Sequence, residues 1–362
     1  MNKFLIIIYC LAAFNITIAQ DVQESRRISQ KVSTAHALGS TDITIVYHSP
    51  SANGRKIFGG IVPYDFVVDG KEYPWRAGSN NRTTIEFSHD VWINGNPVSA
   101  GIYGLLVLVT EKEWTFIFSS NLSWGGFQYT PENDVLRVTV PVKNRPFQEW
   151  LSYDFIDPMA EKLGIELHWT DAAASFEVST NVSANIISDI SKKADKSAED
   201  YKQLAVETYK LYPKQYESAL AYIDSGLTKV NELKESARNY EAFSLNIIKS
   251  DILIENGRKK EGEKLKKEAI SSADHFCMYY YGLYTLMHKN DKDEAYRLLS
   301  DDIKTHPTQW ESYLAMGEYY IKVGNQEKVV ENFKKAYEYA PDNWKNYARY
   351  LYLQNKLILE RG

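Results

Sequence analysis

The spacing of apolar residues changes near residue 185, and this change constrains the fold more than any other feature of the sequence. Before it, apolar and polar residues alternate over short runs that end in turn residues; after it, apolar residues recur every three or four positions. Alternation is typical of β-strands, and the longer spacing is typical of α-helices. Six of the eight tryptophans precede residue 180, whereas 19 of the 26 tyrosines follow it. We therefore predict a multidomain protein, with an all-β domain followed by an all-α domain.

The first domain, residues 28–179, is predicted to be an antiparallel β-sandwich or barrel. Asn94-Gly95 follows the run Val91-Trp92-Ile93, and Asn-Gly is the strongest short signal for a β-hairpin. The other expected strands share either alternation or a continuous apolar run, and they cover residues 42–48, 83–89, 103–109, 114–118, 135–140, 150–156, 163–169 and 175–178. No helical pattern separates these strands, which favours antiparallel pairing.

The second domain, residues 197–362, is predicted to be a tetratricopeptide-like array of helical repeats that follows a linker at residues 180–196. Pro307 lies 34 residues before Pro341, which is the length of that repeat. Between them, Gly317 is a small residue that would let two helices approach closely. Further helices with the same spacing are expected at residues 201–211, 216–231, 240–256, 259–271 and 343–358. One such repeat cannot bury its apolar face alone, so several stacked repeats are expected.

Residues 1–19 are predicted to be a secretory signal peptide. Lys3 is the only charged residue in this segment, residues 4–14 are apolar, and Thr17 and Ala19 are small residues placed for cleavage. An uncleaved membrane anchor is the alternative, but the apolar run is shorter than the roughly 20 residues that a span requires. We therefore expect an exported protein, periplasmic or secreted, with no membrane span after cleavage.

Charge and composition exclude several classes of function. The 47 acidic residues exceed the 42 basic ones and the sequence pI is about 5.9, which argues against a nucleic-acid partner. Cleavage would leave Cys277 as the sole cysteine, so no intramolecular disulfide and no cysteine-rich zinc site is expected. The sequence has no phosphate-binding loop, dinucleotide motif, nucleophile elbow or His-Glu-x-x-His motif. We expect no cofactor, and an enzyme is the less favoured interpretation.

Five blocks of the first half share their residues with a known family. They are residues 54–64, 75–88, 100–104, 113–118 and 134–138. Together they resemble an exported bacterial family called domain of unknown function 2911, over residues 28–178. The resemblance implies a fold and export but no reaction. The sequence departs from the family by a longer stretch at residues 65–74.

One cluster in the first half combines an arginine with a tryptophan and short polar side chains: Trp75, Arg76, Asn80, Asn81 and Thr84. Arginine presents a planar fork of donors to carboxylates and phosphates, and tryptophan offers a flat apolar face. The cluster therefore predicts a site for a glycan or a small anion. The alternative is structural, with Asn80 and Asn81 shaping a turn and Arg76 paired with a carboxylate. The candidate carboxylates are Glu86, Asp134 and Glu149.

The seven histidines do not predict a metal site. None has another histidine two or four positions away. His275 and Cys277 would face different sides of a helix, so they are not expected to share a metal ion. His48 and His89 end candidate strands, and a metal held between them is a minor alternative to ordinary surface or core positions.

The tyrosines of the second half have two interpretations. Most are expected between helices, but tyrosine is also a favoured contact residue in interfaces. The candidates for partner contact in the repeat groove are Tyr280, Tyr284, Tyr313 and Tyr319.

These observations leave three hypotheses for the function. The favoured one is a non-catalytic binding or assembly protein whose repeat groove engages a peptide or a protein partner. The first alternative is a β domain that binds a glycan or small anion through Trp75 and Arg76. The second is hydrolysis of an envelope polymer by carboxylates among Glu86, Asp134 and Glu149.

Overall fold

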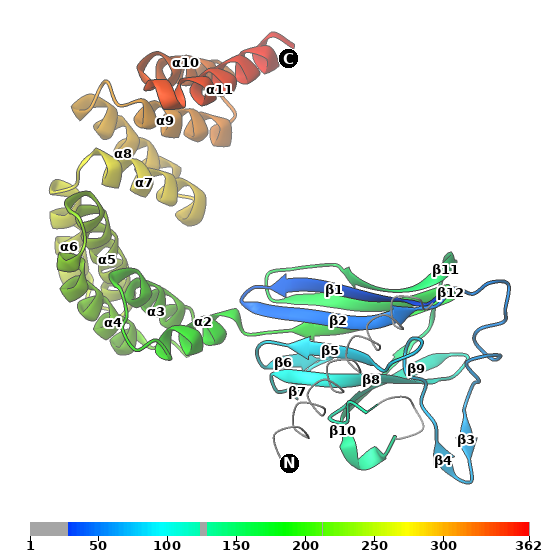
Figure 1. Ribbon diagram of the computed structural model, residues 1–362. Helices are drawn as coiled ribbons and strands as arrows, with labels where there is room; N and C mark the ends of the chain where they lie inside the picture. The colour runs from blue at the N-terminus through cyan, green and yellow to red at the C-terminus, as the bar shows by residue number, and fades with distance from the viewer. Residues whose placement is uncertain (1–27, 124–128, 212, 362) are drawn as a thin grey trace, which may run out of the picture. The chain divides into compact units, whose positions relative to one another are not determined.

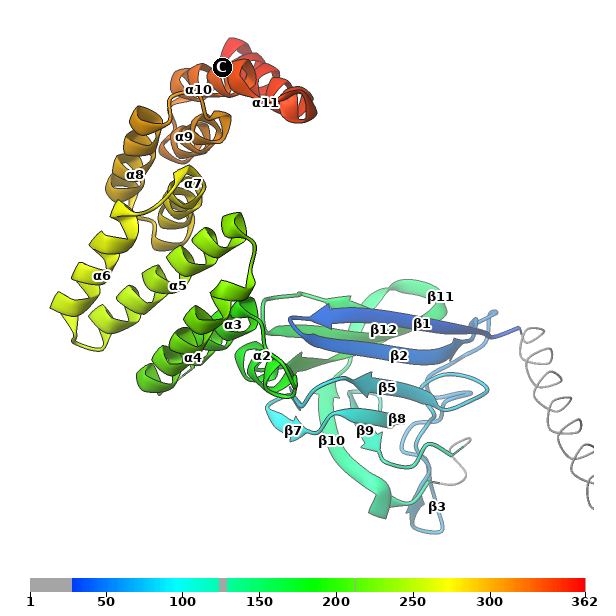
Figure 2. The same ribbon diagram turned by 60° about the vertical axis from the view of Figure 1, so that its left-hand side comes forward.

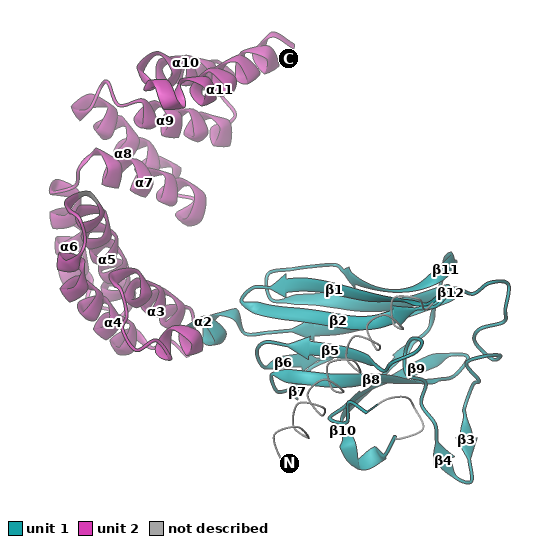
Figure 3. Ribbon diagram, in the orientation of Figure 1, with its two compact units in different colours: residues 1–186 teal, residues 187–362 magenta. Residues whose placement is uncertain are grey.

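A computed structural model describes residues 28–123, 129–211 and 213–361, so the predicted signal peptide lies outside the described residues. The chain divides into two compact units, residues 1–186 and residues 187–362 (Figure 3). Among the described residues, the first unit consists mainly of strands and the second of helices. None of the described helices is both long and apolar enough to span a membrane. The predicted order, a β domain followed by an α-helical array, is confirmed.

A six-stranded antiparallel sheet forms one layer of the first unit, in the order β1-β2-β5-β8-β9-β10 (Figure 1). Its strands are β1 (Gln30–Leu38), β2 (Thr41–Ser49), β5 (Thr83–Phe87), β8 (Gly101–Val109), β9 (Glu113–Ser119) and β10 (Asp134–Pro141). The continuous apolar run of β8 predicted a central strand, and β8 indeed pairs with β5 on one side and β9 on the other. A strand that is covered on both faces needs apolar side chains at every position.

A four-stranded antiparallel sheet, in the order β11-β12-β6-β7, forms the other layer. Its strands are β11 (Lys143–Ile156), β12 (Lys162–Ser179), β6 (Val91–Ile93) and β7 (Asn96–Val98). The hairpin predicted at Asn94-Gly95 joins β6 to β7, and both turn residues have positive φ, 46° and 80°. Two positive φ values are the requirement of a type I′ turn, which Asn-Gly satisfies with little strain.

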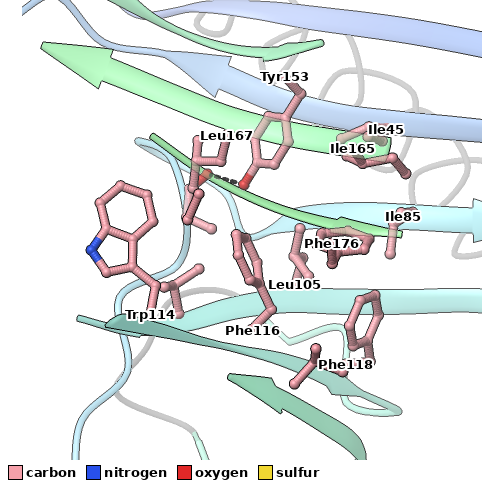
Figure 4. Close-up of a cluster of buried hydrophobic side chains, with 14 of the residues drawn as sticks. Ile45, Ile85, Leu105, Trp114, Phe116, Phe118, Tyr153, Ile165, Leu167 and Phe176 are labelled. Atoms are coloured by element: carbon pink, nitrogen blue, oxygen red, sulfur yellow. Dashed lines mark hydrogen bonds between the residues drawn. The ribbon is translucent and has the colours of Figure 1, made fainter. Parts of the chain in front are cut away.

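The two sheets pack face to face around an aromatic core (Figure 4). Phe176 of β12 lies against Phe116 and Phe118 of β9, with ring centroids 4.9 and 5.3 Å apart. Tyr153 of β11 is buried in the same core, and its hydroxyl donates a hydrogen bond of 2.9 Å to the carbonyl of Ala77. The antiparallel sandwich predicted from the sequence is therefore confirmed.

Two features of the sandwich differ from the predicted strands. Residues 163–169 and 175–178 belong to one strand, β12, which continues through Thr170 although that residue has a φ of 56°. The register of the pairing with β11 shifts beside Thr170. Such a shift is a β-bulge, and it allows one long strand to continue through residues in which the sequence shows no strand pattern. Strand β1 was not predicted, because its alternate positions carry few large apolar residues and it pairs on one side with β2.

The longer stretch at residues 65–74 forms a small hairpin of its own. Strands β3 (Val67–Val68) and β4 (Lys71–Glu72) pair through Asp69-Gly70, both with positive φ. The hairpin sits outside the two larger sheets. A short 3₁₀ helix, η2 (Pro131–Asn133), precedes β10.

Helix α2 (Val182–Ser191) lies in the segment predicted to be a linker. The amide of Asn185 donates hydrogen bonds of 3.0 and 2.8 Å to the hydroxyls of Thr41 and Thr180. These three buried polar groups satisfy one another and fix the first turn of α2 to the start of β2 and to the residue that follows β12. The boundary between the two compact units falls inside α2, after Ile186.

The second unit is an array of helices that follow one another in sequence order (Figure 2). They are α3 (Ala198–Lys210), α4 (Tyr216–Lys229), η3 (Val230–Glu232), α5 (Glu235–Glu255), α6 (Lys259–Ser271), α7 (His275–Tyr284), η4 (Thr285–Lys289), α8 (Lys292–Thr305), α9 (Trp310–Val323), α10 (Gln326–Tyr339) and α11 (Asp342–Arg361). Consecutive helices pack as pairs, α3 with α4, α5 with α6, α7 with α8 and α9 with α10. Helices α3, α5, α7 and α9 also contact one another in turn, so they form one layer of the array.

Two glycines allow the two helices within a pair to approach closely. A Cβ atom on Gly317 of α9 would lie 2.3 Å from the ring of Phe333 on α10, and one on Gly282 of α7 would lie 2.5 Å from Leu299 on α8. Phe333 and Leu299 are both fully buried. The same contact therefore recurs in two neighbouring pairs, as the sequence predicted for Gly317.

Gly317→Ala should destabilise the helical array by roughly 1–3 kcal/mol, because the added methyl group forces the buried Phe333 ring to move in a packed interface. The free energy of unfolding of residues 20–362, measured by urea denaturation, checks this. Lys322→Ala, an exposed change on the same helix, is the matched control and should leave the stability within about 0.5 kcal/mol. Equal stability of Gly317→Ala and the control would contradict the close approach.

Candidate ligand and partner sites

The residues of the predicted ligand cluster separate into three places. Trp75 and Arg76 line a cavity at one end of the sandwich, and Asn81 and Thr84 line another. Asn80 lies between them with a φ of 53°, and its amide donates a hydrogen bond of 3.1 Å to the carbonyl of Ser29. Asparagine tolerates this left-handed conformation better than most residues, so the structural interpretation of Asn80 as a turn residue fits its geometry.

Trp75 is held in a fixed orientation by its neighbours. Its backbone exchanges two hydrogen bonds of 2.8 Å with Val107 of β8. Its indole ring stacks on that of Trp169 from β12, with centroids 6.0 Å apart and planes 20° apart, and its Nε1 donates to the carbonyl of Gly78. The edge of Phe58 packs on it as well. The half-buried Trp75 ring is therefore part of the core and at the same time part of a cavity wall.

The cavity beside Trp75 has a volume of about 260 Å³ and is lined by two arginines and no described carboxylate. The lining residues are Ser29, Pro50, Arg55, Ile61, Val62, Trp75, Arg76, Gly78, Ser79 and Trp169. Arg76 donates from Nη1 to the carbonyl of Asn80 at 2.6 Å. Arg55 donates from Nε and Nη2 to the carbonyls of Ala52 and Ser51, at 3.0 and 2.6 Å. Backbone carbonyls thus accept hydrogen bonds from both guanidinium groups and help to hold them in place.

An adjoining apolar pocket shares Trp75 and Arg76 with this cavity. Its volume is about 200 Å³, and its other lining residues are Ile61, Val62, Pro63, Phe66, Tyr73, Pro74, Val107, Leu108 and Val109. Trp75 and Arg76 therefore border both a mainly apolar pocket and a cavity with a second arginine, which suits a ligand that has both an anionic group and an apolar or ring-shaped part.

Asn81 and Thr84 line a separate cavity of about 330 Å³ that contains three basic side chains. Its lining residues are Lys31, Val46, His48, Asn81, Arg82, Thr84 and Leu122. Arg82 is buried, and Nη1 donates to the carbonyl of Asn121. Burial lowers the pKa of Arg82, although a guanidinium keeps its proton at neutral pH. Asn81 and Thr84 thus contribute to a different site from Trp75 and Arg76.

The metal site considered between His48 and His89 is ruled out by the strand register. In the antiparallel pair of β2 and β5, Val46 lies opposite Thr84 and Ile43 lies opposite Phe87. His48 therefore extends from one end of the pair and His89 from the other. Because a strand rises about 3.3 Å per residue, the two rings are far beyond the reach of one ion.

The three carboxylates of the hydrolase hypothesis lie on different strands with different partners. Glu86 is exposed on β5. Asp134 accepts hydrogen bonds from Tyr129 and Arg137, at 2.7 and 2.8 Å, and burial together with the Asp134 carboxylate raises the pKa of Tyr129. Glu149, in the other sheet, accepts a hydrogen bond from the backbone N–H of Asn53. None of the three lines a cavity described here.

In the helical array, an aromatic cavity of about 200 Å³ opens between α3, α5 and α7. It is lined by Val206, Tyr240, Phe243, Ser244, Ile247, Ile248, Tyr280, Tyr281 and Tyr284. Tyr280 and Tyr284 are 41% and 46% exposed, so their rings reach solvent at its rim. Tyr240 and Phe276 pack edge-on against Tyr280, at 5.5 and 4.6 Å, and this makes the rim rigid.

The other two candidate tyrosines lie elsewhere. Tyr313 is buried, stacks on Tyr339 at 5.6 Å and donates from its hydroxyl to the carbonyl of Pro307. Tyr319 packs against Tyr296 and does not line the cavity. Tyr313 therefore belongs to the core of α9 and α10, which is the alternative that the sequence left open for these tyrosines.

A cluster that the sequence did not predict joins His275, Asp302 and His306. Asp302 and His306 are four residues apart at the end of α8, a spacing that could have been noticed, but His275 comes from α7 and is brought in by the fold. Burial alone would lower the pKa of His275, but the hydrogen bond and charge of Asp302 outweigh this and raise it. Cys277 points elsewhere, toward Asn239, and burial raises the pKa of its thiol to about 12.

Trp75→Ala should destabilise the sandwich by about 3 kcal/mol, because it leaves a cavity beside Trp169 and Phe58. Denaturation monitored by near-ultraviolet circular dichroism measures this. Trp92→Ala is the matched control, since Trp92 is 39% exposed on β6. If both variants lost the same stability, Trp75 would not be a core residue.

Comparison with known protein families gives a match over the first unit. A family model described as "Protein of unknown function (DUF2911)" matches residues 29–178. These residues run from the start of β1 to the end of β12, so the matched region is the sandwich. The search of curated proteins returned no significant match. The chain is thus similar to this family over its β unit.

Proposed function

We propose that this protein is a non-catalytic binding or assembly protein, and that its helical array holds a peptide segment of a partner protein. The observation that carries this proposal is the aromatic cavity between α3, α5 and α7, with Tyr280 and Tyr284 exposed at its rim. Rigid aromatic side chains beside a preformed cavity are typical of the residues that dominate binding energy in interfaces.

The arrangement of the helices supports this proposal. Pairs of helices follow one another, and a small residue permits the same close contact in two of them, Gly282 on Leu299 and Gly317 on Phe333. Together with the 34-residue spacing of Pro307 and Pro341, this supports tetratricopeptide-like repeats. Stacked repeats present a continuous surface made of one helix from each pair, and the cavity lies on that layer.

The lining chemistry defines the segment that would fit. Phe243, Ile247 and Ile248 give the cavity an apolar floor, and the Tyr280 and Tyr284 hydroxyls can bond to peptide groups at the rim. Lys289 beside Tyr284 is already paired with Asp251 at 2.5 Å. A peptide with one or two large apolar side chains in a neutral context suits this surface better than a strongly charged one.

Export is part of the same proposal. The apolar run at residues 4–14 and the small residues Thr17 and Ala19 support cleavage of a signal peptide. The partner would then be a protein of the cell envelope or of the exterior.

The double variant Tyr280→Ala/Tyr284→Ala should weaken binding of selected peptides at least about tenfold, because it removes both aromatic contacts at the rim. Peptides would first be selected on residues 20–362 from a random display library, and their affinities would be measured by fluorescence anisotropy. Circular dichroism would confirm that the variant is folded.

The matched control is Tyr350→Ala on α11, which removes a tyrosine that is 61% exposed and does not line the cavity. It should bind the same peptides with unchanged affinity. The proposal fails if the double variant binds as well as the control, or if the selected peptides bind equally well to residues 20–179.

A second candidate function rests on the cavity at Arg55 and Arg76. Two guanidinium groups, of Arg55 and Arg76, line this cavity beside a stacked tryptophan pair. Arginine forks recognise carboxylates and phosphates in bidentate fashion. The β unit would then bind a small anion or an acidic sugar.

Arg55→Ala and Arg76→Ala should each reduce the affinity for glucuronate or inorganic phosphate by about tenfold or more, because a charged hydrogen bond is worth roughly 1.5–3 kcal/mol. Calorimetric titration of residues 20–362 provides the measurement. Arg145→Ala, which removes an arginine that pairs with Glu166 outside the cavity, is the control. Absence of binding by the unmodified protein, or an equal loss in the control, would reject this site.

A further inference from the structure

We propose that His275, Asp302 and His306 form a binding site for a divalent transition-metal ion with the ligand preference of Zn²⁺. The site lies in the helical array where the start of α7, the end of α8 and the start of α9 meet. It is independent of the aromatic cavity, whose lining contains none of these residues.

The donor atoms are already close to the separations that coordination requires. Nδ1 of His275 lies 3.1 Å from Oδ2 of Asp302, and Nδ1 of His306 lies 3.0 Å from Oδ1. The three ligand atoms all lie within 4.8 Å of one another. Tetrahedral Zn²⁺ with bonds of about 2.0–2.2 Å separates its ligands by roughly 3.3 Å. The distances between the Asp302 oxygens and the two histidine nitrogens are therefore already close to those of a zinc site. The distance between the two histidine nitrogens must change by a small movement of one side chain.

His306 is the ligand that can make this movement. Its side chain is 36% exposed, and the residue caps α8 immediately before Pro307. The side chains of His275 and Asp302 are 14% and 0% exposed, so they form the fixed part of the site. The partly exposed ring also gives an ion a path from solvent to the buried carboxylate.

Ser312 and Glu311 orient the two fixed ligands. The hydroxyl of Ser312 donates a hydrogen bond of 2.6 Å to Oδ2 of Asp302. Nε2 of His275, the nitrogen that would not bind the ion, faces Oε2 of Glu311 at 3.6 Å. Both of these buried atoms lack a hydrogen-bond partner among the described residues. A carboxylate behind a ligating histidine is the usual support of a metal site, and a small shift of either group would complete it.

The donor set selects the class of metal. Two imidazole nitrogens and one carboxylate oxygen suit Zn²⁺ and its neighbours among the transition metals, whereas Mg²⁺ and Ca²⁺ prefer oxygen ligands. Three protein ligands leave a coordination position for water or for a group from a bound molecule. The alternative is that protonated histidines simply neutralise the buried Asp302, with no ion involved.

Calorimetric titration of metal-free residues 20–362 with ZnCl₂ separates the two interpretations. The site predicts one equivalent of Zn²⁺ bound, no binding of MgCl₂, and a visible absorption band from tetrahedral coordination when CoCl₂ replaces ZnCl₂. Loss of a group that hydrogen-bonds to a metal ligand costs about 10–100-fold in metal affinity, so Ser312→Ala should weaken Zn²⁺ binding by about 10–100-fold. Asp302→Asn and His306→Gln should each weaken Zn²⁺ binding by about 100-fold or more.

His288→Ala is the matched control, because His288 is exposed on η4 and lies outside the cluster. It should bind Zn²⁺ as the unmodified protein does. His306→Gln changes a partly exposed side chain, so it keeps the test valid if Asp302→Asn does not fold. Absence of stoichiometric Zn²⁺ binding by the unmodified protein, or unchanged binding by a folded His306→Gln variant, would overturn the proposal.

Discussion

The face-to-face packing of the two β-sheets around Phe176 is the contact on which the first unit depends. Phe176 sits between Phe116 and Phe118 of the opposite sheet, and burial of aromatic rings is among the largest favourable terms in a core. The same packing buries Trp169, which supports the Trp75 ring. The loops that carry Arg55 and Arg76 are thus positioned by a rigid core, as binding loops generally are.

The helical unit depends on a different constraint, which is the close approach of neighbouring helices at small residues. Gly317 and Gly282 admit Phe333 and Leu299 into the space that a side chain would fill. This packing joins the two helices of each pair, whereas contacts among α3, α5, α7 and α9 form the layer in which the aromatic cavity lies. The aromatic cavity takes residues from three helix pairs, whereas the three residues of the histidine cluster all lie in the α7–α8 pair.

The sequence predicted those features that depend on residues close together in the chain. Local signals predicted the Asn94-Gly95 hairpin, the central strand β8 and the helix pair around Gly317, because turn chemistry and periodicity act over a few residues. Strand β1 was missed although it pairs with the next strand, β2, because it carries few large apolar residues. The continuity of β12 through Thr170 was missed because it depends on a bulge in the pairing with β11. Likewise, the sequence placed Trp75 and Arg76 beside Asn81 and Thr84, whereas the fold separates them and adds Arg55. His275 and Asp302 are 27 residues apart, so no short motif could have joined them.

If the layer formed by α3, α5 and α7 is a peptide-binding surface, a bound peptide should slow hydrogen–deuterium exchange of the backbone amides in that layer. Backbone amides of residues 20–362 would be followed with and without a saturating selected peptide. We expect slower exchange in α5 and α7 around Tyr240, Tyr280 and Tyr284, and unchanged exchange in the sandwich. Protection confined to the strands of the sandwich, or spread evenly over both units, would contradict it.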